Sequence, residues 1–226
     1  MSQTNHPSAT IEDYLGVIYT LARDGERVIG ARLAESLDVS APTVTATLKR
    51  MARDGWIAIN ENKDITLTGE GLKAARSVIR RHMLTEWMLS RVLKLPLSEL
   101  HREAHQIEHM ISSEVEERLQ SEMEDPKFCP HGNPLPGYED ATIDWVPLSN
   151  IVPDVKVTLM RIHESLEDNY DSLAYLESLG LMPGAEIIVV EILPFNETIK
   201  VQVDGHQVIL GLRLADKIFV ASPDEH

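Results

Sequence analysis

The stretch SAPTVTATLKRMARDGW, residues 40–56, has the pattern of one short amphipathic helix. The hydroxyl of Ser40 can accept a hydrogen bond from a free N–H of the first turn, and Pro42 fits that turn because it has no N–H. Apolar residues recur at helical spacing, which predicts one buried face. The predicted buried residues are Val44, Leu48 and Met51.

Two further helices precede this stretch and a hairpin follows it. IEDYLGVIYTLA (residues 11–22) has apolar residues at helical spacing and ends before Gly25, and IGARLAESL (29–37) predicts a second, shorter helix. Only a few residues join that helix to the one after Ser40, as in a helix-turn-helix. WIAINENKDITLT (56–68) alternates around a polar centre, which predicts a β-hairpin wing. The first part of the chain is therefore predicted to be a winged helix-turn-helix.

Hydroxyl and basic side chains occupy the outer face of the third helix. The N-terminus of a helix can bind phosphates or approach base edges, and basic side chains can contact flanking phosphates. The alternative is an ordinary helical hairpin whose basic end only complements the helix dipole. The adjacent wing favours DNA binding. The residues expected to contact DNA are Arg32, Ser40, Pro42, Thr43, Thr45, Ala46, Lys49, Arg50 and Lys63.

The net charge of −15 over 226 residues is distributed unevenly. Residues 1–80 hold ten Lys or Arg and ten Asp or Glu, whereas residues 81–226 hold eleven and twenty-six. Because neutralisation of phosphates dominates affinity for DNA, the first portion is the one suited to approach it. The polar start of the chain, the lone Cys129 and the lack of a long apolar run predict a cytoplasmic protein with no membrane partner.

HREAHQIEH, residues 101–109, concentrates imidazoles and carboxylates on a helix that is expected from about Ser98 to Met123. Four of these side chains fall on one helical face: His101, His105, Glu108 and His109. His82 and Glu86 have the same i, i+4 relation on a preceding helix that starts near Thr68. Imidazoles and carboxylates gathered in this way indicate a site for divalent cations, and an exposed charged face is the alternative.

The remaining sequence predicts a connector followed by a small β-barrel. The stretch from Cys129 to Trp145 is rich in Pro, Gly and acid and is expected to cross the surface. Cys129 and His131 could form part of a metal site, but two ligands at the edge of a loop are more often incidental. Five short β-rich runs lie beyond it, with one helix in DSLAYLESLG that ends at Gly180. A passive stabilising module and a regulatory domain are both open interpretations of this barrel.

Five stretches occur in the order found in one protein family: IEDYLGVIYTL, APTVTATLKRMARDGW, RRHMLTEWML, HREAHQIEHMISSEVEERL and GNPLPG. Over essentially the whole chain, the sequence resembles the diphtheria toxin repressor family of metal-dependent transcriptional regulators. The resemblance implies a mainly α fold with α+β elements. It divides the chain into a winged helix-turn-helix (1–77), a helical dimerisation and metal domain (78–146) and an SH3-like barrel (147–226). It also implies a homodimer that binds a double-stranded DNA operator.

The resemblance implies two metal sites per subunit. The family's primary ligands fall on Asp13, His105, Glu108 and His109, and its ancillary ligands fall on His82, Glu86, His101, Glu164 and Glu167. Iron-responsive relatives have Met and Cys where this chain has Asp13 and His105. Manganese-responsive relatives commonly have two carboxylates there and another acid where this chain has Gly16.

Loss of the soft thioether and thiol ligands favours Mn²⁺, with Fe²⁺ as the alternative. Co²⁺, Zn²⁺ or Cd²⁺ are expected to substitute in vitro, because Mn²⁺ lies at the weak end of the usual affinity order. The recognition helix also departs from its relatives. Where they often carry Gln, this chain has Ala46, which can make only apolar contact with a base, for instance with a thymine methyl.

These features predict a repressor of metal-ion homeostasis in which the cation is the corepressor. Asp13 belongs to the DNA-binding domain and His105 to the dimerisation domain, so one cation would join the two and set the separation of the recognition helices. A hydrolytic metalloenzyme is the first rival, but the sequence has no HExxH or nucleophile-elbow motif. A helix-turn-helix regulator that senses an organic ligand is the second, and it would leave the histidine cluster unexplained.

Overall fold

The structure is a computed structural model that describes residues 7–221. The chain divides into two compact units. Unit 1 contains the described residues up to Arg81 together with Glu108–Ile111, and unit 2 contains His82–Ile107 together with the described residues from Ser112 onward. The extreme ends of the predicted first and third domains lie outside the described residues.

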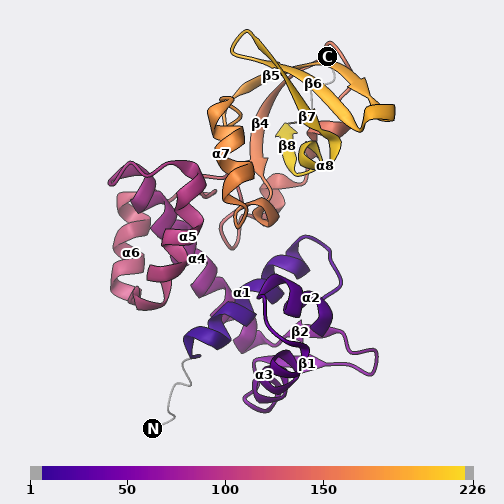
Figure 1. Cartoon of the computed structure of the whole chain (residues 1–226). Helices are drawn as coiled ribbons and strands as arrows, with labels where there is room; N and C mark the ends of the chain where they lie inside the picture. The colour runs from indigo at the N-terminus through magenta and orange to yellow at the C-terminus, as the bar shows by residue number, and fades with distance from the viewer. Residues whose placement is uncertain (1–6, 222–226) are drawn as a thin grey trace. The chain divides into compact units, whose positions relative to one another are not determined.

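Unit 1 has the predicted winged helix-turn-helix (Figure 1). Its elements are α1 (Ala9–Arg23), α2 (Gly30–Ser36), α3 (Ala41–Arg53), β1 (Ile57–Ile59), β2 (Ile65–Leu67) and the first part of α4 (Gly69–Arg91). The side chain of Ser40 accepts a hydrogen bond from Thr43 N at 3.3 Å and caps α3, as its sequence predicts. The two strands pair antiparallel, with Ile57 opposite Leu67, and form the wing.

The core of unit 1 is made by one face of each helix and by the hairpin. The predicted stripe of Val44, Leu48 and Met51 is buried, and it packs in one cluster with residues of α1 such as Leu15. The start of α4 is held against the hairpin by a close backbone approach. A Cβ on Gly71 would lie 1.9 Å from the carbonyl oxygen of Trp56, so only glycine fits at this crossing.

The ligand-bearing helix is shorter than its periodicity predicts. One helix from about Ser98 to Met123 was expected, but the structure has α5 (Leu97–Ile107), a 3₁₀ turn (Glu108–Met110) and α6 (Ser113–Glu122). The break arises because Ser112 has extended backbone, with φ −76° and ψ 161°, and its side chain accepts from Val115 N at 3.3 Å. A residue in that conformation ends one helix and caps the next.

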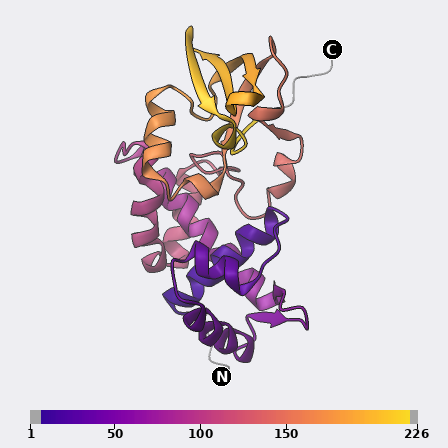
Figure 2. The ribbon, with the colours of Figure 1, turned by 45° about the vertical axis from the view of Figure 1, so that its right-hand side comes forward.

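Unit 2 contains the predicted small barrel (Figure 2). Its strands follow the order β3-β8-β4-β5-β6-β7, and every pair is antiparallel. The elements are β3 (Trp145–Pro147), β4 (Lys156–Ile162), α7 (Tyr170–Ser178), β5 (Glu186–Leu193), β6 (Thr198–Val203), β7 (His206–Gly211), α8 (Leu212–Ala215) and β8 (Ile218–Ala221). Strand β3 was not predicted from the sequence, because it has only three residues.

The helices of unit 2 and its sheet share one hydrophobic core. Leu100 and Ala104 of α5 lie in the same buried cluster as Leu159 of β4 and Leu176 of α7. The carboxylate of Glu177 also caps α5, because Leu97 N donates to it at 3.0 Å and Ser98 Oγ donates at 3.0 Å. The histidine-bearing helix is therefore fixed to the barrel by both packing and hydrogen bonds.

The first part of the predicted surface connector is buried, so that expectation was wrong for residues 129–136. Ile162 N donates to the carbonyl of His131 at 2.8 Å, and the side chain of Asn133 donates to Ile162 O at 2.9 Å. A Cβ on Gly132, which has φ +87°, would lie 2.0 Å from Met160 O. The segment packs against β4 because its polar backbone groups find partners there.

Candidate metal centres and nucleic-acid interface

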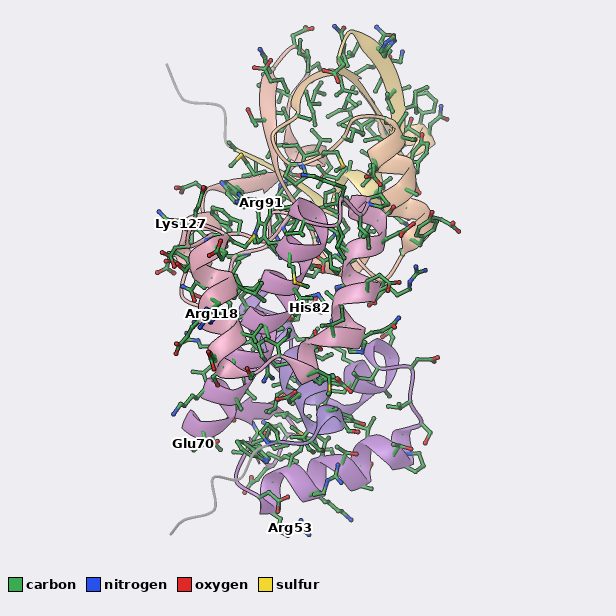
Figure 3. The ribbon with its side chains drawn as sticks, turned by 90° about the vertical axis from the view of Figure 1, so that its left-hand side faces the viewer. Arg53, Glu70, His82, Arg91, Arg118 and Lys127 are labelled. Atoms are coloured by element: carbon green, nitrogen blue, oxygen red, sulfur yellow. The ribbon has the colours of Figure 1, made fainter. Side chains whose placement is uncertain are left out.

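All nine residues predicted to contact DNA are exposed on unit 1. Ser40 and Thr43 are hydrogen-bonded to each other through their hydroxyls at 2.8 Å, at the N-terminus of α3. Lys49 and Arg50 follow on α3, whose far end is marked by Arg53 in Figure 3. Arg32 forms an ion pair with Glu26 within the same unit. The exposed face of α3 thus offers hydroxyls at one end and cationic side chains toward the other.

Three of the four predicted primary ligands lie together in unit 1. His109 Nε2 is 3.0 Å from Asp13 Oδ1 on α1 and 3.5 Å from Glu108 Oε1. Glu108 is buried, and it lies with His109 in the 3₁₀ turn after α5. His105, the fourth predicted ligand, is on α5 and belongs to unit 2. The break in the helix therefore assigns consecutive ligands of one motif to different units.

Glu12 is a functional candidate that the sequence analysis missed. Its Oε2 lies 2.6 Å from His109 Nδ1, and its Oε1 accepts from Arg81 Nη2 at 2.6 Å. A carboxylate on one imidazole nitrogen fixes the ring and leaves the other nitrogen for a metal. With Nδ1 donating to Glu12, Nε2 carries a lone pair that faces Asp13, an arrangement suited to an intervening cation. The only signal in the sequence was the acidic pair at positions 12 and 13.

A second cluster, the ancillary group, lies wholly in unit 2. It consists of His82, Glu86, His101 and Glu167, whose ligand atoms all lie within 4.8 Å of one another. His82 Nε2 is 3.2 Å from Glu86 Oε1 and 3.0 Å from His101 Nδ1. His101 Nδ1 is also 3.0 Å from Glu167 Oε2. Two imidazoles and two carboxylates at these separations fit a divalent cation.

Burial and neighbouring charges act against each other in this group. Burial raises the pKa of Glu86, but the charges of His131 and His82 outweigh it and hold that pKa well below its usual value. Burial lowers the pKa of His101, but hydrogen bonds to Asp168 and Glu167 outweigh it and raise that pKa well above its usual value. The metal-free group therefore favours carboxylates balanced by protonated imidazole.

The barrel supplies one of its two predicted ligands to the ancillary group. Glu167 is buried within it, whereas Glu164 is half-buried at the start of a short 3₁₀ helix and is not among the four grouped residues. Asp168, which the sequence analysis did not select, places Oδ1 3.3 Å from His101 Nε2. Adjacent acidic residues in this loop thus reach the same imidazole.

Comparison with known proteins identifies the family. Family models match residues 6–65 ("Iron dependent repressor, N-terminal DNA binding domain"), 68–137 ("Iron dependent repressor, metal binding and dimerisation domain") and 146–222 ("FeoA domain"). The iron-dependent repressor IdeR of Mycobacterium leprae is 35% identical over 88% of this chain and 90% of its own length. The chain belongs to the iron-dependent repressor family.

Other members of the family resemble this repressor in sequence and structure. The diphtheria toxin repressor of Corynebacterium diphtheriae is 32% identical over 80% of this chain and 84% of its own length. A manganese-dependent transcriptional repressor solved with manganese has a TM-score of 0.83 and 31% identity, covering 94% of this chain and 100% of that one. ScaR with bound Zn²⁺ has a TM-score of 0.77 and 30% identity, covering 96% and 100%.

The family membership decides between the rival functions. This repressor is a metal-dependent DNA-binding regulator and not an enzyme, because its relatives are transcriptional repressors. The matched domains indicate DNA and a second copy of the chain as partners. Among the described residues, the structure contains no helix with the length and apolar character that crossing a bilayer requires.

Proposed function

We propose that this repressor binds its operator when Asp13, Glu108 and His109 of unit 1 and His105 of unit 2 hold one divalent cation together. The observation that carries this proposal is the arrangement around His109, whose ring is fixed by Glu12 and directed at Asp13 on α1. A bound cation supplies the positive charge that offsets the repulsion of the clustered carboxylates. Residues on both units would then be restrained relative to each other.

The restraint matters because the repressor acts as a dimer. In a twofold dimer, the orientation of each unit 1 sets the separation of the two α3 helices, and that separation must match half-sites one or more helical turns apart. Without a cation that both units ligate, only a small fraction of the protein has the arrangement that binds the operator. The apparent affinity for the operator is reduced by that fraction.

We propose Mn²⁺ as the physiological corepressor, with Fe²⁺ as the alternative. The primary ligands contain imidazoles and carboxylates without thiolate or thioether, which suits hard and borderline cations. The similarity to a repressor solved with manganese supports the same choice. Co²⁺, Zn²⁺ and Cd²⁺ are expected to occupy the site in vitro because they follow Mn²⁺ in the affinity order or resemble it in geometry.

We also propose a second cation per subunit in the ancillary group. Glu167 comes from the loop after β4, while His82 and Glu86 come from α4, so their joint ligation would tie the barrel to the helices. The segments 1–77, 78–146 and 147–226 would then serve DNA binding, dimerisation and regulation. The protein would act in the cytoplasm on a double-stranded operator of metal-homeostasis genes, without an organic effector.

The test is operator binding as a function of free metal. Fluorescence anisotropy with DNA from upstream of the protein's own gene should show binding that Mn²⁺ induces and EDTA reverses. Asp13→Ala should abolish the metal-dependent part while the protein stays a folded dimer. Tight, chelator-sensitive binding by Asp13→Ala would contradict the proposal, as would wild-type binding that EDTA does not affect.

A further inference from the structure

The turn that joins β1 and β2 of the wing, residues 60–64, is held in one conformation by its own hydrogen bonds. Lys63 N donates to Asn60 O at 3.0 Å, and Asp64 N donates to Asn60 Oδ1 at 2.9 Å. Lys63 has φ +63°, in the left-handed region that residues other than glycine rarely adopt. Such a conformation persists where the surrounding contacts determine it. The position of Lys63, which is expected to contact DNA, therefore depends on the bonds around this turn.

Arg27 adds a bond to each neighbour of Lys63. Its guanidinium donates through Nε to Asp64 Oδ1 and through Nη2 to the carbonyl oxygen of Asn62, the latter at 3.1 Å. Arg27 lies outside the wing, in the segment between α1 and α2. The carbonyl of the next residue accepts from Ile65 N of β2 at 3.0 Å, so the backbone of that segment runs beside the wing. One side chain from another part of unit 1 thus holds the two residues that flank Lys63.

The wing turn and α3 share a groove of about 380 Å³. Its lining includes Arg27, Asn62 and Lys63, together with Thr45 and Leu48 of α3. Lys63 is therefore presented beside the helix that is expected to contact the operator. A groove with cationic side chains next to that helix is suited to the sugar-phosphate backbone of one DNA strand.

The ion pair of Arg27 with Asp64 is too exposed to matter much for folding. The two side chains are 60% and 29% exposed, and ion pairs in contact with water contribute little to stability. Direct contact of Arg27 with a phosphate is the alternative role. However, the carboxylate of Asp64 offsets the charge of Arg27, so the pair presents no net cation to DNA. Placement of the turn is the effect that the pair can have.

We propose that Arg27 and Asp64 are positioning residues that hold Lys63 at a phosphate of the operator backbone. The inference rests on the proposed function, because it concerns how the repressor contacts its operator. Without the pair, the turn gains conformational freedom, which it must lose again when Lys63 binds a phosphate. Operator affinity should then fall, although the removal of an acid from the wing would by itself favour a polyanion.

Two matched substitutions on the wing turn separate positioning from charge. Asp64→Ala and Glu61→Ala each remove one negative charge, but Asp64 bonds to Arg27 whereas Glu61 is exposed in the turn. Charge alone predicts tighter operator binding for both variants. We expect tighter binding for Glu61→Ala and weaker binding for Asp64→Ala. The slope of log K against log salt should fall by about one in Asp64→Ala, as in Lys63→Ala, and stay unchanged in Glu61→Ala.

Arg27→Lys is the second test, because it keeps the charge but lacks the planar fork that reaches two acceptors. It should lower the slope as Asp64→Ala does. In a Lys63→Ala background, neither substitution should lower the slope further, since the contact that they position is already absent. Fluorescence anisotropy with the full-length, Mn²⁺-loaded protein and its operator DNA gives affinities and slopes, and thermal melts show whether each variant is folded.

The proposal is overturned if Asp64→Ala binds as tightly as Glu61→Ala with the wild-type slope, or if Arg27→Lys keeps the wild-type affinity and slope. It is also overturned if the effects of Asp64→Ala and Lys63→Ala on the slope add. A lower melting temperature with an unchanged slope would restrict the pair to a structural role and overturn it as well. All variants are compared on the same DNA, so the result stands even if EDTA does not affect wild-type binding. That outcome would contradict only the metal control in the proposed function.

Discussion

His109 presents its two ring nitrogens to two consecutive carboxylates of α1. Glu12 lies on Nδ1 and is itself held by Arg81, while Asp13 lies on Nε2. Neighbouring residues of one helix thus take different tasks: Glu12 orients the ring, and Asp13 is positioned to share a cation with it. Orientation of this kind lowers the entropy that the ligand loses on binding.

Substitution of Glu12 tests this division of tasks. Glu12→Gln keeps the size of the side chain but removes the charge that orients His109, so the affinity of the primary site for Mn²⁺ should fall by about 10–100-fold. Isothermal titration of the full-length protein measures the change. Glu35→Gln on the exposed face of α2 is the control, and it should titrate like wild type. Identical isotherms for both variants would show that Glu12 does not contribute to metal binding at the primary site.

The pKa of His101 gives the ancillary group a definite pH dependence. Asp168 and Glu167 raise this pKa well above 6.5 despite burial, so protons compete with the cation for His101. Metal affinity should therefore keep rising with pH well above 6.5, in the range where an ordinary histidine has already lost its proton. Asp168→Asn removes one negative charge that faces His101 and should move the rise to lower pH in metal titrations at a series of pH values. A profile that is unchanged in the variant would contradict this assignment.

At the scale of elements, the sequence predicts what periodicity and local chemistry encode. The helices and wing of unit 1, the capping by Ser40 and the helix that ends before Gly180 were all predicted correctly. The break after Ile107 was not, because the apolar spacing runs on through it and one extended residue, Ser112, decides it. One capping residue is a weaker signal in a sequence than an apolar pattern that repeats over several helical turns.

Two features of unit 2 were not predicted for another reason. One is the burial of residues 129–136, and the other is which acidic residue of the loop after β4 joins the ancillary group. Both depend on contacts between distant segments. Pro and Gly in the former suggested a surface loop, but its backbone bonds to β4. In the loop, Glu164 and Glu167 are equivalent by composition, and only the fold brings Glu167 to His101. The histidines of the two helices, in contrast, were selected because they share helical faces, and Asp13 was selected through the family resemblance.

The cap that separates α5 from α6 can be tested directly. Ser112→Ala removes the acceptor for Val115 N and should lower the free energy of unfolding by about 1 kcal/mol. Urea denaturation at a fixed protein concentration measures it, since a dimer's stability depends on concentration. Ser121→Ala, an exposed change inside α6, should have little effect. Equal midpoints for the two variants would mean that the cap does not stabilise this break.

Glu167 and Glu164 provide a matched pair for the ancillary group. Glu167→Gln retains an acceptor for Asn133 but removes a charged ligand, so the affinity for the second Mn²⁺ should fall by at least about tenfold. Glu164→Gln should leave that affinity unchanged, since Glu164 is not in the group of four. Calorimetric titration of both proteins with Mn²⁺ makes the comparison. Loss of affinity in Glu164→Gln alone would reverse the assignment.

At the scale of the whole molecule, charge is segregated along the chain. The portion up to residue 80 is balanced, and all of the net −15 arises beyond it. Attraction to DNA must therefore come from a few local cations on the winged helix-turn-helix, while most of the chain repels a polyanion. When binding depends on few phosphate contacts, the placement of those side chains matters more than the overall charge. A metal that controls this placement can therefore control binding.

Salt dependence measures those contacts. Lys49→Ala and Arg50→Ala each remove one exposed cation of α3, so each should weaken binding to the Mn²⁺-loaded protein and lower the slope of log K against log salt by about one. Anisotropy titrations over a range of salt concentrations give the slopes. Lys156→Ala, on the barrel, is the control and should keep the wild-type slope. Unchanged slopes for Lys49→Ala and Arg50→Ala would place the phosphate contacts elsewhere.

The single cysteine also provides a chemical probe of local opening in this part of the molecule. Cys129 is almost entirely enclosed, in a segment whose backbone is bonded to β4, so a thiol reagent can reach it only during an excursion that lifts this segment away. The rate of labelling therefore reports how often this segment opens. Measuring the labelling rate as each metal is added in turn would show which cation suppresses this local opening. The measurement needs no DNA.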